Sequence, residues 1–175
     1  MNVNAPIALV GASYSTPDQS DLDFQAVWGA RQDGDFHHTA VAVLTKDSAG
    51  QLRVTRHNST AKHLEWGGAL LGAALVLLAP AAGIDMLHKV GMSGVGALVD
   101  HFRVNADPED LAATASLLEA GACGLVVVLV NRRSRTLGSL LTHAGGSWSV
   151  DMPWGDLEEG LSKEFARPRA LALSS

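Results

Sequence analysis

The run from Gly67 to Ile84 contains no charged residue, although charged residues lie on both sides of it. If its eighteen residues formed one helix rising about 1.5 Å per residue, they would extend roughly 27 Å, close to the thickness of a bilayer core. A chain with such a segment must place it in lipid, bury it in its own fold or cover it with another subunit.

The segments on either side indicate that this run does not span a membrane. Residues 40–58 alternate apolar and polar side chains around the sequence Ser-Ala-Gly at 48–50, which predicts a β-hairpin. Residues 123–131 are a continuous Val/Leu-rich run, typical of a strand covered on both faces. A single crossing would separate the hairpin from this strand and leave too few strands on either side for a stable sheet. The next apolar run, residues 90–99, is too short to cross back.

A punctuated helix is predicted over residues 105–121. Asp107 is a suitable N-cap, Pro108 occupies the first helical position, and Gly121 follows the last turn. Acidic residues directly after the proline suit the positive end of the helix dipole. These local signals fix both ends of the helix.

A strand and a helix are predicted near the N-terminus. Residues 5–14 are a short apolar run with Gly11 and Ser13 near its end, which predicts a buried strand. After Pro17, apolar residues recur at helical spacing, and Leu22, Val27 and Ala30 share one face of the predicted helix.

The order of elements favours an α+β fold in one domain over residues 1–175. It reads strand, helix, strand, strand, apolar helices, helix, strand, helix, strand, and its core is the βαββαβ arrangement of a ferredoxin-like sandwich. A glycine-rich helical hairpin at about 61–101 is predicted as an insert. Residues 154–175 are predicted to form a C-terminal helix and tail.

The small residues of the apolar region favour packing of helix against helix. Gly68 and Gly72 lie four residues apart, on one face of a helix, and Pro80 with Gly83 provides a place to bend. The hairpin would pack on its own sheet or against the same hairpin of a second copy. The residues expected at a contact between copies are Trp66, Gly68, Gly72, Leu75, Gly91 and Gly94.

Charge and cysteine content exclude several classes of function. The net charge is −5 and the pI is about 5.7, which argues against nucleic-acid binding through bulk electrostatics. One cysteine cannot form an internal disulfide. The N-terminal residues lack the basic start of a signal peptide, so the expected location is the cytoplasm, with membrane association as the alternative.

Histidine and cysteine residues give no pattern of a catalytic or metal site. Asp35, His37 and His38 lie at the start of a predicted strand, where adjacent side chains point to opposite faces and cannot share one ion. No HxH, HxxxH or HExxH spacing occurs. Cys123 begins the most apolar strand and is expected to be a core residue. We predict no catalytic residue, metal or cofactor, and the sequence does not indicate which residues would bind a ligand.

The sequences AVAVLTKDSAGQLRV, GGALLGAALVLLAPAAG and MSGVGALVDHF, followed by a capped helix and CGLVVVLVN, resemble a bacterial and archaeal group catalogued as domain of unknown function 1269. The resemblance covers roughly residues 35–152. Members are often labelled predicted membrane proteins, and the resemblance implies a stress-associated or housekeeping role without an assigned reaction. Here the apolar region is shorter than is usual and contains Asp85, His88 and Lys89.

Three functions are compatible with these patterns. The leading hypothesis is a non-enzymatic homo-oligomer assembled through the glycine-rich helices. The first alternative is a peripheral membrane protein that inserts residues 67–99 into a bilayer. The second is a small-molecule sensor or enzyme on a ferredoxin-like sheet, which a fold alone does not establish.

Overall fold

The computed structural model describes residues 6–32, 38–59, 64–90, 94–130 and 136–153, together with residues 155 and 157. The strands are β1 (Pro6–Tyr14), β2 (His38–Lys46), β3 (Leu52–Ser59), β4 (Cys123–Val130) and β5 (Gly146–Pro153). The helices are α1 (Pro17–Gln32), α2 (Leu64–Leu78), α3 (Pro80–Val90), α4 (Val95–Asn105), α5 (Pro108–Ala120) and α6 (Thr136–Leu140). Apart from residues 155 and 157, the predicted C-terminal helix and tail lie outside the described residues.

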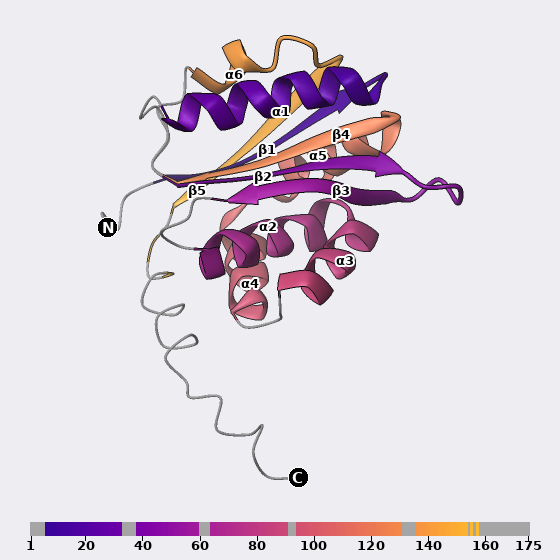
Figure 1. The fold of residues 1–175 in the computed structure, drawn as a ribbon. Coiled ribbons are helices and arrows are strands. Elements are labelled where there is room, and N and C mark those ends of the chain that lie inside the picture. The colour runs from indigo at the N-terminus through magenta and orange to yellow at the C-terminus, as the bar shows by residue number, and fades with distance from the viewer. Residues whose placement is uncertain are drawn as a thin grey trace.

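The five strands form one antiparallel sheet in the order β3-β2-β4-β1-β5, so the fold class is α+β (Figure 1). Strand β2, from before the apolar region, pairs with β4, from after it, and Ala40 lies opposite Val128. The predicted hairpin and the predicted buried strand therefore share one sheet, as the sequence argument required. Among the described helices, none combines the length and hydrophobicity needed to traverse a bilayer.

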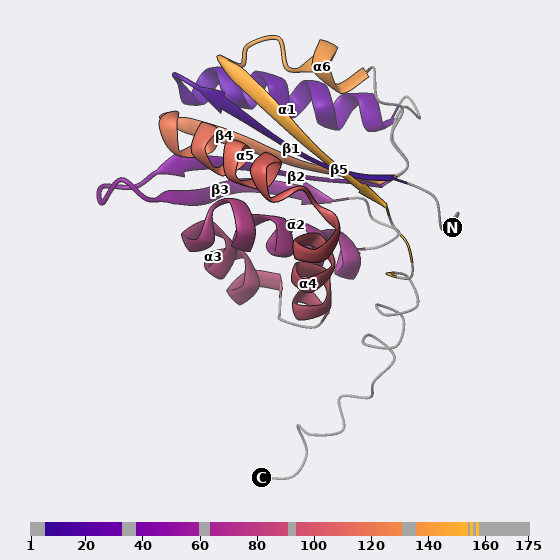
Figure 2. The ribbon, with the colours of Figure 1, turned by 180° about the vertical axis from the view of Figure 1, so that it is seen from behind.

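Helices cover both faces of the sheet. Figures 1 and 2 show α1 and α6 on one face and α2 to α5 on the other. Alternate residues of β4 belong to two separate cores: Val126 and Val128 face α2–α5, whereas Val127 and Leu129 face α1 and α6. All eight residues of β4 are buried, which confirms the prediction from its continuous apolar run.

The local turn and cap signals are confirmed. The Asp107 carboxylate accepts a hydrogen bond of 2.8 Å from the backbone N–H of Glu109, and α5 begins at Pro108. At the hairpin turn, the Asp47 N–H donates to the Gln51 carbonyl at 2.8 Å, and Gly50 has a φ of 76°. This left-handed conformation favours glycine because a side chain there is strained.

The apolar region forms three helices rather than a two-helix hairpin. Pro80 has no N–H to continue α2, so α2 ends at Leu78 and α3 begins at Pro80 after a single linking residue. Gly83 lies directly on the α2 backbone, since a Cβ atom there would come within 2.5 Å of the Val76 nitrogen. Helix α2 also contacts α4, so it is the central helix of this layer.

The buried face of α1 differs from the predicted one at Leu22. Val27 and Ala30 are buried as expected, but Leu22 is 51% exposed and the polar residue Asp23 is fully buried. The spacing of apolar residues could not predict the burial of Asp23, because that burial depends on polar partners of its carboxylate beneath the helix.

Candidate functional site

Four of the six residues predicted to join two copies are described by the structure and pack inside the single subunit. Gly68, Gly72, Leu75 and Gly94 are buried in the single subunit. A Cβ atom on Gly72 would lie 3.1 Å from the Leu87 side chain of α3, so this glycine serves the contact of α2 with α3. The side chain of Trp66, and Gly91, lie outside the described residues.

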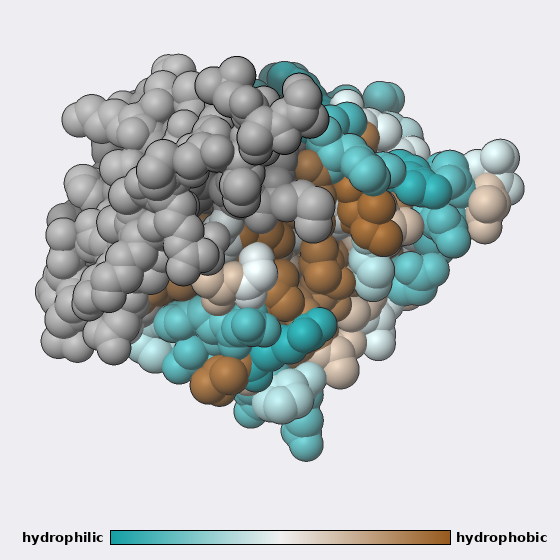
Figure 3. Space-filling view, turned by 90° about the horizontal axis from the view of Figure 1, so that it is seen from below, coloured by the Kyte–Doolittle hydropathy of each residue, from teal (hydrophilic) through white to brown (hydrophobic). Residues whose placement is uncertain are grey.

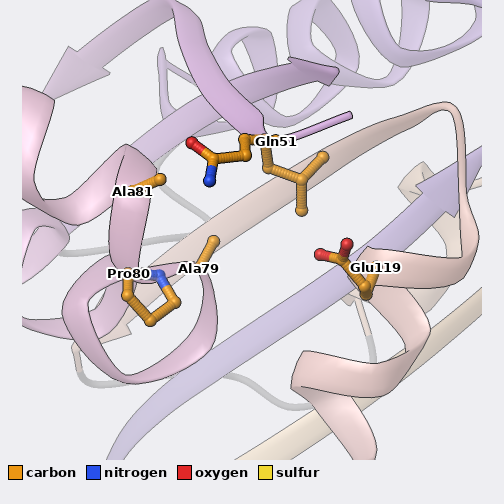
Figure 4. A pocket seen from close by; sticks show the side chains of 6 residues that line it. Gln51, Ala79, Pro80, Ala81 and Glu119 are labelled. Carbon is orange, nitrogen blue, oxygen red and sulfur yellow. The ribbon is translucent and has the colours of Figure 1, made fainter. Parts of the chain in front are cut away.

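A cavity of about 260 Å³ lies where the hairpin turn, the α2–α3 corner and the end of α5 meet (Figure 4). Its walls combine a small apolar surface with two longer polar side chains. Figure 4 shows the Gln51 amide and the Glu119 carboxylate reaching into the same space from opposite sides. The lining residues are Gln51, Leu52, Ala79, Pro80, Ala81 and Glu119.

Arg53 fixes the orientation of the Gln51 amide. Its Nε donates to Asp47 at 3.1 Å, its Nη1 to Asp85 at 3.0 Å, and its Nη2 to the Gln51 Oε1 atom at 3.1 Å. Since the amide oxygen accepts from Arg53, the amide nitrogen of Gln51 is directed into the cavity (Figure 4). Arg53 therefore links the hairpin to α3 and orients one polar group of the cavity.

The charges of this network stabilise one another. The backbone N–H of Gln51 and then the Arg53 guanidinium lower the pKa of the Asp47 carboxyl below its ordinary value. Hydrogen bonds to Asp47 and Asp85 raise the pKa of Arg53. Asp47 and Arg53 therefore both stay charged through the neutral pH range, and the bond from Arg53 to the Gln51 amide is maintained there.

Glu119 has a different environment. Lys46 Nζ donates to its main-chain carbonyl at 2.5 Å, which ties the end of α5 to β2. Within the described part of the chain, no hydrogen bond or ion pair engages the Glu119 carboxylate. The carboxylate is an exposed acceptor at the edge of the cavity.

A second polar cluster lies on the opposite face of the sheet, under α1. The Asp23 carboxylate accepts from the Tyr14 hydroxyl at 3.0 Å, from the His143 Nδ1 atom at 2.7 Å and from the His143 backbone N–H at 3.2 Å. Burial, followed by the charge of Asp23 and the hydrogen bond to it, raises the pKa of the Tyr14 phenol well above its ordinary value. Tyr14 therefore remains a donor.

This cluster holds three elements together. Because an ionised carboxylate only accepts, the His143 Nδ1 atom must carry its proton, and the second ring nitrogen, Nε2, is directed away from Asp23. The His143 side chain is 44% exposed, whereas that of Asp23 is 1% exposed. The buried charge is satisfied by its donors and fixes α1 against the end of β1 and the segment before β5.

The described residues contain no group of three His, Cys, Asp or Glu side chains arranged to hold a metal ion. Asp35 and His37, and the side chain of His38, lie outside the described residues. Cys123 is 1% exposed, which confirms its prediction as a core residue, and burial is the main cause that raises the pKa of its thiol.

The hairpin, the apolar helices and β4 are the parts of the fold on which the resemblance to domain of unknown function 1269 depends. No family model, curated protein or solved structure matches the chain. Membership in that group therefore stands as a proposal.

Neither polar cluster was predicted from the sequence. Asp23 and His143 are 120 residues apart, so only the tertiary fold brings them together. One signal in the sequence could have indicated the burial of Asp23. It lies next to Phe24 and one helical turn before Val27, and this position places Asp23 on the buried face of the helix. Gln51 and Glu119 carried no comparable signal, because Gln51 is an exposed residue just before β3 and Glu119 is exposed in the last turn of α5.

Proposed function

We propose that the protein acts by self-association rather than by catalysis, and that copies meet through the outer surface of the α2–α4 layer. The observation that carries this proposal is the exposure of large apolar side chains there: Ile84 of α3 is 54% exposed and Val104 of α4 is 82% exposed. Val76, Leu77 and Leu87 are partly exposed in the same layer. Figure 3 shows apolar residues gathered over the middle of this face, between polar margins.

The apolar side chains set the scale of the association. Burying a fully exposed Ile or Val side chain contributes about 1.5–3 kcal/mol, so the exposed parts of Ile84 and Val104 would contribute about 1–2 kcal/mol each. In a symmetric dimer each residue counts on both copies, giving roughly 4–8 kcal/mol. Association itself costs about 4–15 kcal/mol. We therefore expect a weak, concentration-dependent dimer that also uses the partly exposed residues.

This interface differs from the one predicted from the glycine pattern. Gly68, Gly72 and Leu75 already pack within the subunit, so they are not accessible to a second copy unless the helices separate. The outward side chains of the same helical layer are accessible. We therefore propose that the same helical layer makes the contact through Ile84 and Val104 instead of through its glycines.

Sedimentation velocity without detergent tests the proposal. Val104→Glu places a charge at the proposed contact and should weaken the dimer by at least about tenfold. Leu22→Glu is the matched control, because Leu22 is 51% exposed on α1, on the opposite face of the sheet, and should leave the association unchanged. A wild-type protein that stays monomeric at high concentration contradicts the proposal, and so does an equal effect of the two variants.

The alternative function, insertion of this layer into a membrane, predicts a different result. A membrane-inserting protein would co-sediment with lipid vesicles, and Val104→Glu would release it. Association between copies in the absence of lipid, with no vesicle binding, favours self-association. Vesicle binding lost in Val104→Glu but kept in Leu22→Glu would replace our proposal by the membrane alternative.

We further infer that the sheet is a variant of the ferredoxin-like arrangement and that the chain belongs to the group it resembles. The order β2-β4-β1-β5 has the neighbour relations of a four-stranded ferredoxin-like sheet if β3 and helices α2–α5 are one insert between β2 and β4. In support, α1 and α6 follow β1 and β4 and lie on the same face. In this arrangement the insert is larger than residues 61–101, since it begins with β3.

A further inference from the structure

We propose that the cavity between Gln51 and Glu119 binds a small amine that carries a hydrogen-bond acceptor beside its ammonium group, the chemical class of α-amino acids and amino alcohols. The proposal is independent of self-association, because the cavity is formed entirely by one chain. It rests on three features: a donor held in a fixed orientation, an acceptor with which no described side chain pairs, and an apolar wall between them.

The donor is the Gln51 amide nitrogen. Its orientation is determined by the bond from Arg53 to the amide oxygen, and Arg53 is held in turn by Asp47 and Asp85. Rotating the amide would turn its nitrogen toward the guanidinium and break that bond. The cavity therefore presents a preorganised donor, which suits a carbonyl, carboxylate or hydroxyl oxygen of a ligand.

The acceptor is the Glu119 carboxylate on the facing wall (Figure 4). Within the described part of the chain, no side chain pairs with this carboxylate. Lys46 donates to the main-chain carbonyl of Glu119 instead. A carboxylate beside an apolar surface favours a cation that can also donate hydrogen bonds, and a primary ammonium group satisfies both requirements. The ligand thus has its cation at Glu119 and its acceptor at Gln51.

The size of the cavity limits the ligand. At about 260 Å³ it lies below the 300–1,000 Å³ range of sites for drug-sized molecules. Since a cavity of about 150 Å³ binds benzene, this one accommodates a ligand of about ten non-hydrogen atoms. Pro80 and Ala81, the more exposed of the apolar lining residues, offer an apolar contact for a methyl or methylene group. A short amino acid such as alanine, with six non-hydrogen atoms, fits within this limit.

Titration of isotope-labelled protein, followed by NMR, tests the proposal with three probes. L-alanine has both groups, ethylamine only the ammonium, and propionate only the carboxylate. We expect alanine to shift the amide signals of Gln51, Leu52 and Ala81 with a millimolar Kd, ethylamine to bind more weakly, and propionate to give no saturable shift. Absence of saturable shifts with alanine, or equal shifts with propionate, would overturn the proposal.

Two variants locate the binding groups. Glu119→Gln keeps the shape but removes the charge, and it should weaken alanine binding by about tenfold or more. Gln51→Ala should reduce alanine binding to the level of ethylamine. Glu109→Gln is the matched control, since Glu109 lies at the other end of α5 and should change nothing. The proposal is refuted if Glu119→Gln binds alanine as the wild type does, or if Glu109→Gln weakens binding equally.

Discussion

The contact between α3 and α2 at Gly83 allows a stability change to be worked out in advance. A Cβ atom on Gly83 would lie 2.5 Å from the Val76 nitrogen, 2.7 Å from the Val76 Cα and 2.8 Å from the Leu75 carbonyl carbon. All three atoms belong to the α2 backbone, which cannot rotate away as a side chain can. In Gly83→Ala the two helices must therefore separate.

Two opposing effects set the magnitude. Overpacking of a dense core typically costs about 1–3 kcal/mol, and a rigid backbone contact belongs at the upper end of this range. Alanine gains up to about 1 kcal/mol over glycine as a helix former. The expected net loss is therefore about 2 kcal/mol. For a domain of this size, 1 kcal/mol corresponds to roughly 2–4 °C in Tm, so Gly83→Ala should melt about 4–8 °C below the wild type.

Thermal and urea unfolding followed by circular dichroism, at a concentration where the protein is monomeric, would measure this change. Gly29→Ala in α1 is the matched control, because no atom lies within 4 Å of the added Cβ. This variant has only the propensity gain and should be more stable by about 0.5–1 kcal/mol. If the Tm of Gly83→Ala equals or exceeds that of the wild type, α2 and α3 do not pack as closely at Gly83 as described here.

Two further predictions use residue types that occur once in the chain, so a spectroscopic or chemical signal reports a single site. The raised pKa of Tyr14 means that the folded protein should show no tyrosinate absorbance at about pH 11, whereas the unfolded chain ionises near its ordinary pKa of about 10. The stability that Tyr14 contributes is therefore present below about pH 10 and falls as the pH rises above that value. Tyrosinate formation in the folded protein near pH 10 would contradict the raised pKa. Cys123 is buried and its thiol has a raised pKa, so it should react with a thiol reagent at pH 8 only after the protein unfolds. Stoichiometric labelling of the native protein within minutes would contradict the burial of Cys123 in β4.

Features that depend on neighbours in sequence were predictable. The Asp107 cap, the turn that contains Gly50 and the double-sided burial of β4 follow from local backbone geometry and from residue pattern. The presence of strands from before and after the apolar run in one sheet was also predictable, since neither group could form a stable sheet alone.

Features that depend on distant neighbours were not predictable from pattern. The spacing of apolar residues placed Leu22 on the buried face of α1, but the fold buries Asp23 because Tyr14 and His143 satisfy its carboxylate there. The glycine pattern correctly indicated close helix packing, but it could not show whether the partner was α3 of the same chain or a second copy.

The sequence by itself determined most of the local elements and the α+β class, because caps, turns and apolar periodicity act over a few residues. It did not separate the apolar region into α2, α3 and α4. The tertiary structure decided the strand order, the role of Gly72 and the placement of Gln51 and Glu119 around one cavity. The physical reason is that these depend on which surfaces come together when the chain buries its apolar residues, and many alternative arrangements satisfy the same local pattern.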